Sequence, residues 1–209
     1  MDLDLFNPSK YSSEEIQNLR NSFNAKNLIV FSGALQDLNI IIDSAKSVIS
    51  DFPETKYLIL GDHRDPNRSK DQWKKKVQQK GLDSFFIFTG KKPREEIPKF
   101  LLCADVCIDS FPDEPYYAAA HPVKLLEYGA CGKPIVATKV TETEKLLKHE
   151  LFGYLASPSN SDEFAHNLKL LLNSAQLRQD ISLNFLNHVK TNFNWNIIAE
   201  NLEKILNKN

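Results

Sequence analysis

The chain has 209 residues, of which 42% are hydrophobic and 25% are charged, a composition typical of a folded globular domain and not of a disordered or low-complexity chain. Its 26 basic and 27 acidic residues give a net charge of −1, which argues against a nucleic-acid-binding protein whose affinity comes from phosphate neutralisation. No apolar run approaches the ~18 residues of a membrane-spanning helix, and the acidic N-terminus is not that of a secretory signal.

Short apolar runs predict β-strands that are buried on both faces of a sheet, because almost every position in them is aliphatic or aromatic. The runs cover residues 28–32, 56–60, 85–89, 105–109 and 134–138, with a weaker one at 153–156. A glycine directly follows each of the first three runs: Gly33, Gly61 and Gly90. Since glycine lets the chain turn sharply or approach a ligand closely, these positions indicate a site at the strand ends.

Between the strands, apolar residues recur at spacings of three and four, which is the pattern of amphipathic helices. The predicted helices cover residues 38–49, 70–80, 94–103, 123–130, 142–147, 161–173, 175–192 and 195–207, with a shorter one at 13–23. This alternation predicts an α/β fold with a doubly wound, Rossmann-like parallel sheet and helices on both faces. Ligands of such sheets bind outside the carboxyl ends of the strands, which is where the three glycines lie.

The segment from residue 120 to 138 carries the densest set of candidate binding residues. Pro122 suits the first turn of a helix, whose free N–H groups and dipole favour an anion. Lys124 lies in that first turn and could add a positive charge to a phosphate site. Glu127 shares its face of the helix and could accept hydrogen bonds from a ribose diol. The alternative interpretation is a solvated Lys124–Glu127 pair that stabilises the helix by ~0.2–0.5 kcal/mol.

This segment reads PVKLLEY at residues 122–128 and CGKPIVAT at residues 131–138. It resembles the signature P-x-K-x-x-E-Y-x-A-x-G-K-P-V-V-A of the group 1 (family-4) glycosyltransferases, which are two-lobed enzymes of GT-B fold. Further stretches resemble motifs of that family, in the family's own order: residues 1–8, 31–33, 58–62, 87–90, 104–106 and 152–155. The first of them is similar to the hinge that follows the acceptor lobe. The chain thus resembles the C-terminal, donor-nucleotide lobe of such an enzyme.

The resemblance implies three parts of the chain. Residues 1–27 would form a hinge or lead-in segment, and residues 28–192 a Rossmann-like domain that binds a nucleotide sugar. Residues 193–209 would form a C-terminal helix that crosses back to an N-terminal lobe missing here. Exposed apolar residues on that helix would then be an interface without its partner.

The resemblance also implies which residues bind the donor. Glu127 would bind the ribose, and Lys124 with His121 would lie near the phosphates or the sugar. Gly33 would let its loop approach the diphosphate, and the loop at Lys91 would border the base. The implied nucleotide-sugar-binding residues are Gly33, Gly61, Gly90, Lys91, His121, Lys124, Leu125 and Glu127. No metal is expected, because a helix N-terminus and cationic side chains would do the work of a divalent ion; no catalytic residue is assigned.

By this resemblance, the chain is the donor-binding lobe of a glycosyltransferase of the hexosyltransferase type, which transfers a sugar from a nucleotide-diphosphate sugar to an acceptor hydroxyl. The expected setting is the synthesis of cell-envelope polysaccharide or glycolipid. The expected partners are the nucleotide sugar and an N-terminal acceptor-binding lobe, in cis or in trans, and not nucleic acid. Three cysteines without a metal-binding pattern (Cys103, Cys107, Cys131) favour a reducing cytoplasmic location. A lipid-linked acceptor would add peripheral contact with the inner face of the membrane.

Three positions depart from the family pattern. Ala34 stands where the family usually has an arginine, and residues 36–39 hold no lysine where the family has one. Ala119 stands where the Glu-x7-Glu pair of the family would begin. Because the loss of one charge-stabilising group typically lowers the rate by ~10²–10³, we expect the chain alone to be incomplete or weakly active.

Other cations could take over the role of the missing ones, namely Lys124, His121 and Arg64. If none does, the chain is a degenerate lobe that binds a nucleotide or a partner without catalysing transfer. A nucleotide-sugar epimerase of the same fold is a further alternative, and it would need acids and histidines from the missing lobe.

Overall fold

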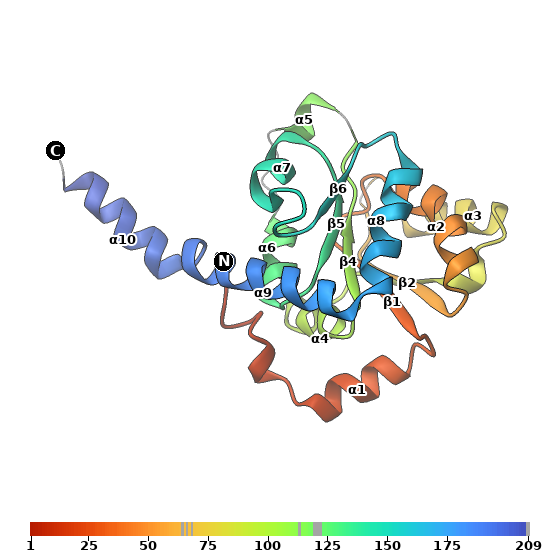
Figure 1. The fold of residues 1–209 in the computed structure, drawn as a ribbon, viewed down its shortest axis with the longest axis horizontal. Helices are drawn as coiled ribbons and strands as arrows, with labels where there is room; N and C mark the ends of the chain where they lie inside the picture. Colours follow the sequence, from red (N-terminus) through yellow and green to blue (C-terminus); the bar gives the residue numbers. More distant parts are fainter. Residues whose placement is uncertain (64, 66, 68, 113, 119–122, 208–209) are drawn as a thin grey trace.

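A computed structural model describes residues 1–209 apart from residues 64, 66, 68, 113, 119–122 and 208–209. Across the described residues, six parallel strands form one sheet in the order β3-β2-β1-β4-β5-β6 (Figure 1). The strands are β1 (Asn27–Ser32), β2 (Thr55–Leu60), β3 (Phe86–Gly90), β4 (Val106–Asp109), β5 (Ile135–Thr138) and β6 (Tyr154–Ala156). Every predicted strand is confirmed to within a single residue at each end. The doubly wound, Rossmann-like sheet is confirmed too, with the winding reversed between β1 and β4.

Helices cover both faces of the sheet, as predicted (Figure 1). Those before β3 are α1 (Ser13–Asn21), α2 (Asn39–Asp51) and α3 (Lys70–Gln79). Those after it are α4 (Ile97–Leu102), α5 (Pro115–Ala118), α6 (Val123–Ala130), α7 (Thr141–Leu147), α8 (Ser161–Asn173), α9 (Ala175–Asn192) and α10 (Trp195–Leu206). The predicted helix 94–103 begins instead as a 3₁₀ turn (Arg94–Glu96), because Pro98 has no N–H to donate to the carbonyl group of Arg94. The sequence pattern does not predict α5.

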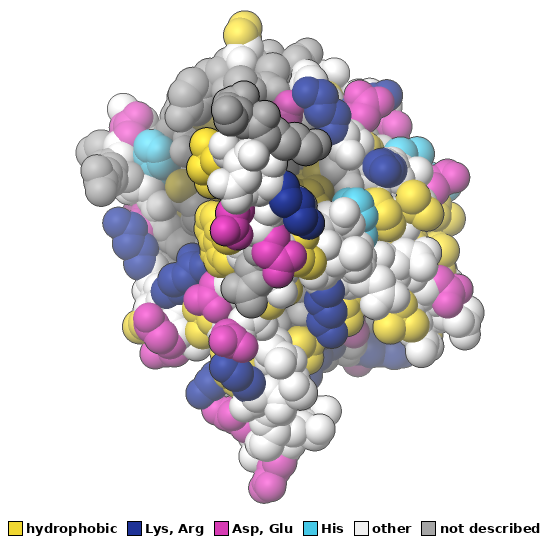
Figure 2. All heavy atoms as spheres, turned by 90° about the vertical axis from the view of Figure 1, so that its left-hand side faces the viewer, with side chains coloured by type: hydrophobic (Ala, Val, Ile, Leu, Met, Phe, Trp, Pro, Cys, Tyr) yellow, Lys and Arg dark blue, Asp and Glu magenta, His cyan; other side chains and the backbone are white. Residues whose placement is uncertain are grey.

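The last helix, α10, projects from the body of the domain (Figure 1). Its apolar side chains are largely exposed, with 63% of Trp195 and 65% of Ile205 accessible. Figure 2 looks at the molecule from the side toward which α10 projects and shows hydrophobic side chains gathered at the centre of that face. Across the part of the chain that the structure describes, none of the helices combines the length and the hydrophobicity needed to cross a membrane.

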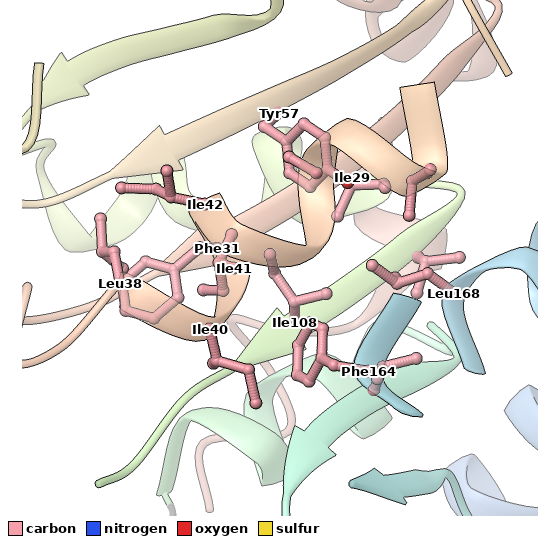
Figure 3. Close-up of a cluster of buried hydrophobic side chains, with 14 of the residues drawn as sticks. Ile29, Phe31, Leu38, Ile40, Ile41, Ile42, Tyr57, Ile108, Phe164 and Leu168 are labelled. Atoms are coloured by element: carbon pink, nitrogen blue, oxygen red, sulfur yellow. The ribbon is translucent and has the colours of Figure 1, made fainter. Parts of the chain in front are cut away.

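Two layers of apolar side chains, one on each face of the sheet, form the core. Ile29 and Phe31 of β1 belong to the first layer with residues of α2, α3 and α8, whereas Leu28 and Val30 belong to the second with residues of α4, α6 and α9. Figure 3 shows the first layer, where side chains of α2 and α8 meet the strands. Burying one such side chain contributes about 1.5–3 kcal/mol. Burial on both faces therefore holds β1 at the centre of the sheet.

The lead-in segment 1–27 packs against the second layer. Phe6 is fully buried within that layer. Arg20 of α1 donates a hydrogen bond from Nη2 to Asp105 Oδ2 (2.7 Å), and the same oxygen accepts from the Leu28 N–H (2.7 Å). These contacts tie α1 to the beginnings of β1 and β4. The lead-in segment thus shares the core of the Rossmann-like domain.

The three cysteines are buried and free. Burial raises the pKa of the Cys103 thiol to about 11 and that of the Cys131 thiol to about 12. Both thiols therefore stay protonated at neutral pH, and a protonated buried thiol behaves as a small apolar group. The cysteines therefore serve apolar packing.

We expect His188 on α9 to make the stability of the domain depend on pH. Its ring stacks on Phe152 with the ring centroids 4.5 Å apart, and burial, together with Lys148, lowers its pKa below the usual 6.5. The unfolded chain therefore binds a proton at His188 at a higher pH than the folded chain does. The contribution of the neutral His188 ring to the free energy of unfolding is present above about pH 6.5 and is lost as the pH falls below that value. Replacing His188→Phe keeps an aromatic ring on Phe152. It should reduce the loss of stability between about pH 7 and about pH 5.5 in urea denaturation; an equally steep loss would contradict the expectation.

Candidate functional site

The loops that follow β1, β2 and β3 are in direct contact with one another. The Gly33 N–H donates a hydrogen bond to the Leu60 carbonyl oxygen (2.9 Å), and the Gly61 N–H donates one to the Gly90 carbonyl oxygen (2.9 Å). A Cβ atom on Gly61 would lie 1.9 Å from the Gly33 carbonyl oxygen, and the φ of Gly61 is +128°. Only glycine fits at such a position, so the glycine that follows β2 has a direct steric cause.

Tyr128 holds helix α6 against the end of β1. Its hydroxyl accepts a hydrogen bond from the Ser32 N–H (2.9 Å) and donates one to the Ser32 carbonyl oxygen (3.1 Å). Burial raises the pKa of Tyr128 well above its usual value, so the hydroxyl keeps the proton that it donates. Sequence reasoning did not assign this role, although a tyrosine inside the PVKLLEY motif was the signal available for it.

A cavity of about 570 Å³ opens over these loops, a volume in the ~300–1,000 Å³ range of small-molecule sites. It brings together Gly33 and Gly61, Lys91 from the loop after β3, and Glu127 from α6. These predicted residues therefore meet at the carboxyl end of the sheet, where such folds bind their ligands. Phe6 of the lead-in segment also lines the cavity.

Glu127 lies at the wall of this cavity with 13% of its side chain exposed. Arg94 Nη1 donates a hydrogen bond to Glu127 Oε1 (3.2 Å), and the guanidinium of Arg94 lies over the ring of Phe6, 5.4 Å from its centroid. Burial raises the pKa of Glu127, while the charges of Arg94 and Lys124 act to lower it. A carboxylate offers about four acceptor positions on its two oxygens, so Glu127 has acceptor capacity beyond the bond to Arg94.

Lys124 is not among the residues that line the cavity, and its described hydrogen bond goes to another element of the fold. Its ammonium bonds to Asp109 Oδ1 at the end of β4 (2.8 Å), and only 17% of its side chain is exposed. The alternative of a solvated Lys124–Glu127 pair is wrong, because Glu127 bonds to Arg94 and Lys124 to Asp109. Helix α6 therefore directs Glu127 toward a cation and Lys124 toward an anion, each on another element of the fold.

The loop after β2 supplies residues that sequence reasoning did not select for the site. Asp62 and His63 both line the cavity. Asp62 Oδ1 accepts hydrogen bonds from the Lys70 N–H (2.8 Å) and the His63 N–H (2.9 Å), and these bonds lower the pKa of Asp62. Its carboxylate therefore stays ionised and caps the first turn of α3. A polar run directly after a strand-ending glycine was the signal for these residues.

The remaining predicted site residues do not line the cavity or lie outside the described residues. Leu125 is fully buried in the second core layer, which leaves only its backbone for a ligand. Gly90 ends β3 with a φ of +72°, beside the ammonium of Lys70. His121 lies outside the described residues, as do the substitute cation Arg64 and the positions of Ala119 and Pro122.

The model of the family described as "Glycosyl transferases group 1" matches residues 12–185. The chain belongs to the group 1 glycosyltransferases. Its fold is that of the C-terminal lobe of a GT-B enzyme, because it superposes on such a lobe over almost its full length. That lobe is the C-terminal domain of the group 1 glycosyltransferase LpcC from Francisella tularensis, with a TM-score of 0.79 and 23% identity over 93% of this chain and 99% of that one.

Two further relatives place this glycosyltransferase domain within longer proteins. It is similar to HepE of Anabaena, solved in complex with UDP-glucose, with a TM-score of 0.85, 20% identity, and 100% of this chain and 56% of HepE covered. It is 29% identical over 146 residues to the amylovoran biosynthesis glycosyltransferase AmsK of Erwinia amylovora, which covers 66% of this chain and 34% of AmsK. At these identities HepE and LpcC show the shared fold. The chain spans about half the length, or less, of the curated relatives it matches.

The contact between the first two glycine loops predicts a large difference between two glycine substitutions. Gly61→Ala would force a Cβ against the Gly33 carbonyl oxygen and should destabilise the fold by more than ~3 kcal/mol. Gly132 also has a positive φ (+64°), but a Cβ there would meet only Leu186 at 3.7 Å. The control Gly132→Ala should therefore cost only ~1–2 kcal/mol of backbone strain. Urea denaturation measures both; equal losses would contradict the steric argument.

Proposed function

We propose that the chain is the donor-binding lobe of a glycosyltransferase that transfers a sugar from a nucleotide-diphosphate sugar to an acceptor hydroxyl. The observation that carries the proposal is the meeting of Gly33, Gly61 and Glu127 in one cavity of a group 1 glycosyltransferase lobe. HepE, which shares the fold, was solved with UDP-glucose, and AmsK is a glycosyltransferase of amylovoran biosynthesis. These relatives support a nucleotide sugar as donor and the synthesis of a cell-envelope polysaccharide or glycolipid as the setting.

Each part of the donor would meet a different part of the cavity. The Glu127 carboxylate would accept hydrogen bonds from the ribose hydroxyls, the Gly33 loop would lie against the diphosphate, and Lys91 would border the base. Transfer breaks the bond between the anomeric carbon and the diphosphate oxygen, forms a bond to the acceptor oxygen, and releases the proton of the acceptor hydroxyl. Positive groups beside the Gly33 loop would stabilise the departing diphosphate.

An acceptor-binding lobe, in cis or in trans, would complete the enzyme. The lead-in segment 1–27 is the proposed hinge, since Phe6 brings it to the cavity wall. Residues 193–209 are the proposed contact to the second lobe, and the exposed apolar side chains of Trp195, Leu202 and Ile205 support this role. Apolar surface of this kind marks contact sites when it is contiguous.

The ribose role of Glu127 is tested by comparing UDP with 2′-deoxy-UDP in isothermal titration calorimetry. We expect Glu127→Gln to weaken UDP binding about 10-fold or more, because a hydrogen bond to a charged group contributes ~1.5–3 kcal/mol. Loss of the 2′-hydroxyl should weaken binding to the wild-type chain and have a smaller effect on the variant, since the partner of that hydroxyl is altered.

The matched control is Glu142→Gln, which changes a surface glutamate that is paired with Lys145. It should bind both nucleotides like the wild-type chain. Equal discrimination between UDP and 2′-deoxy-UDP by the wild-type chain and by Glu127→Gln would contradict the ribose assignment. If the wild-type chain bound none of UDP, GDP, ADP and their sugar conjugates, the proposed function itself would be overturned.

A second candidate function is a non-catalytic lobe that binds a nucleotide or a partner. Ala34 favours it, because this residue lines the cavity at the place where the family usually carries an arginine. The two candidates differ in turnover and not in binding. Release of UDP from UDP-glucose in the presence of an acceptor lobe would support the enzyme; nucleotide binding without any release would support the non-catalytic lobe.

A further inference from the structure

A buried ion pair lies beside the Gly33 loop. Lys124 Nζ is 2.8 Å from Asp109 Oδ1, and a Cβ atom on Gly33 would lie 3.4 Å from Lys124 Nζ. The ammonium also lies over the rings of Phe31 and Phe111, 4.7 and 4.8 Å from their centroids. Contacts with a carboxylate, two aromatic faces and a glycine therefore hold one positive charge against the loop that the proposed function assigns to the diphosphate.

The two partners of this pair differ in exposure. None of the Asp109 side chain is accessible, whereas 17% of Lys124 is, so the pair turns its positive end toward solvent. Asp109 Oδ1 also accepts a hydrogen bond from the Ser110 N–H (2.8 Å), while the buried Oδ2 has no hydrogen-bond partner within the described ranges. An ammonium has three donors, and the bond to Asp109 uses one of them. Among the described residues the ammonium makes no other hydrogen bond, which leaves donors for an anion.

Stability alone is a weak explanation for this arrangement. A buried ion pair can often be replaced by apolar residues of similar volume without loss of stability. The unpartnered Oδ2 of Asp109 adds a desolvation cost that such a replacement would remove. A role in binding explains why a charge is kept at this place.

We infer that Asp109 is a positioning residue: it holds the Lys124 ammonium beside the Gly33 loop, where Lys124 contacts the diphosphate of the donor. The inference rests on the proposed function and specifies where its phosphate site takes its charge, from α6 and β4 instead of the loop after β1. Since Glu127 lies one turn further along α6, a single helix would present both the ribose carboxylate and the phosphate cation.

The test compares UDP with uridine in calorimetric titrations of the 209-residue chain. The double variant Lys124→Met/Asp109→Asn removes both charges and so leaves no buried charge unpaired. It should bind UDP about 10- to 100-fold more weakly and uridine unchanged, because only the diphosphate would meet Lys124. Asp109→Asn alone should weaken UDP binding by a smaller factor and also leave uridine unchanged, because Lys124 keeps its charge but loses its anchor.

The control is Lys169→Met, since Lys169 on α8 forms a more exposed pair with Asp51 on α2 (2.6 Å). It should change neither affinity. Circular dichroism verifies that each variant is folded, and Asp109→Ser replaces Asp109→Asn if the latter is not. An unchanged ratio of UDP to uridine affinity in the double variant would overturn the inference while leaving the proposed function intact. Tighter UDP binding by the single Asp109 variant would overturn the positioning role, and a wild-type chain that binds no nucleotide would overturn both proposals.

Discussion

The close packing of Gly61 against the carbonyl oxygen of Gly33 is the contact on which the candidate site depends. Because no side chain separates these loops, the backbone hydrogen bonds of the sheet continue beyond the strand ends, from Gly33 to Leu60 and from Gly61 to Gly90. At Gly33 and Gly61 the floor of the cavity presents backbone, because these residues have no side chain. A diphosphate could approach such a surface closely, and Tyr128 places α6 at its edge through both backbone groups of Ser32.

The charged side chains of the site form ion pairs between different elements of the fold and not within one helix. Helix α6 carries one anion and one cation, yet Glu127 pairs with Arg94 and Lys124 pairs with Asp109. Each pair therefore links α6 to a different part of the fold. Since Arg94 also lies over Phe6, the lead-in segment is connected through one side chain to the proposed ribose-binding carboxylate. Movement of the proposed hinge would therefore displace Arg94, the partner of that carboxylate.

Membership of the family explains the fold of this chain but not the placement of its charged side chains. The group 1 glycosyltransferase fold is retained at 20% identity to HepE, because it depends on burying alternate strand residues on two faces and on glycines at the strand ends. The charged side chains beside the glycine loops do not determine this frame. In this chain an alanine, Ala34, follows Gly33, and the ammonium of Lys124 lies beside Gly33, where it pairs with Asp109.

The sequence predicted the strands, nearly all of the helices, the fold class and the position of the glycine loops, because these depend on periodicity and turn chemistry within short stretches. It also indicated that Gly33, Gly61, Lys91 and Glu127 belong together. The ion-pair partners of α6 and the place of Phe6 in the cavity wall became known from the folded chain alone. Those contacts join residues far apart in the chain, and no local pattern encodes which distant side chain a buried charge will meet.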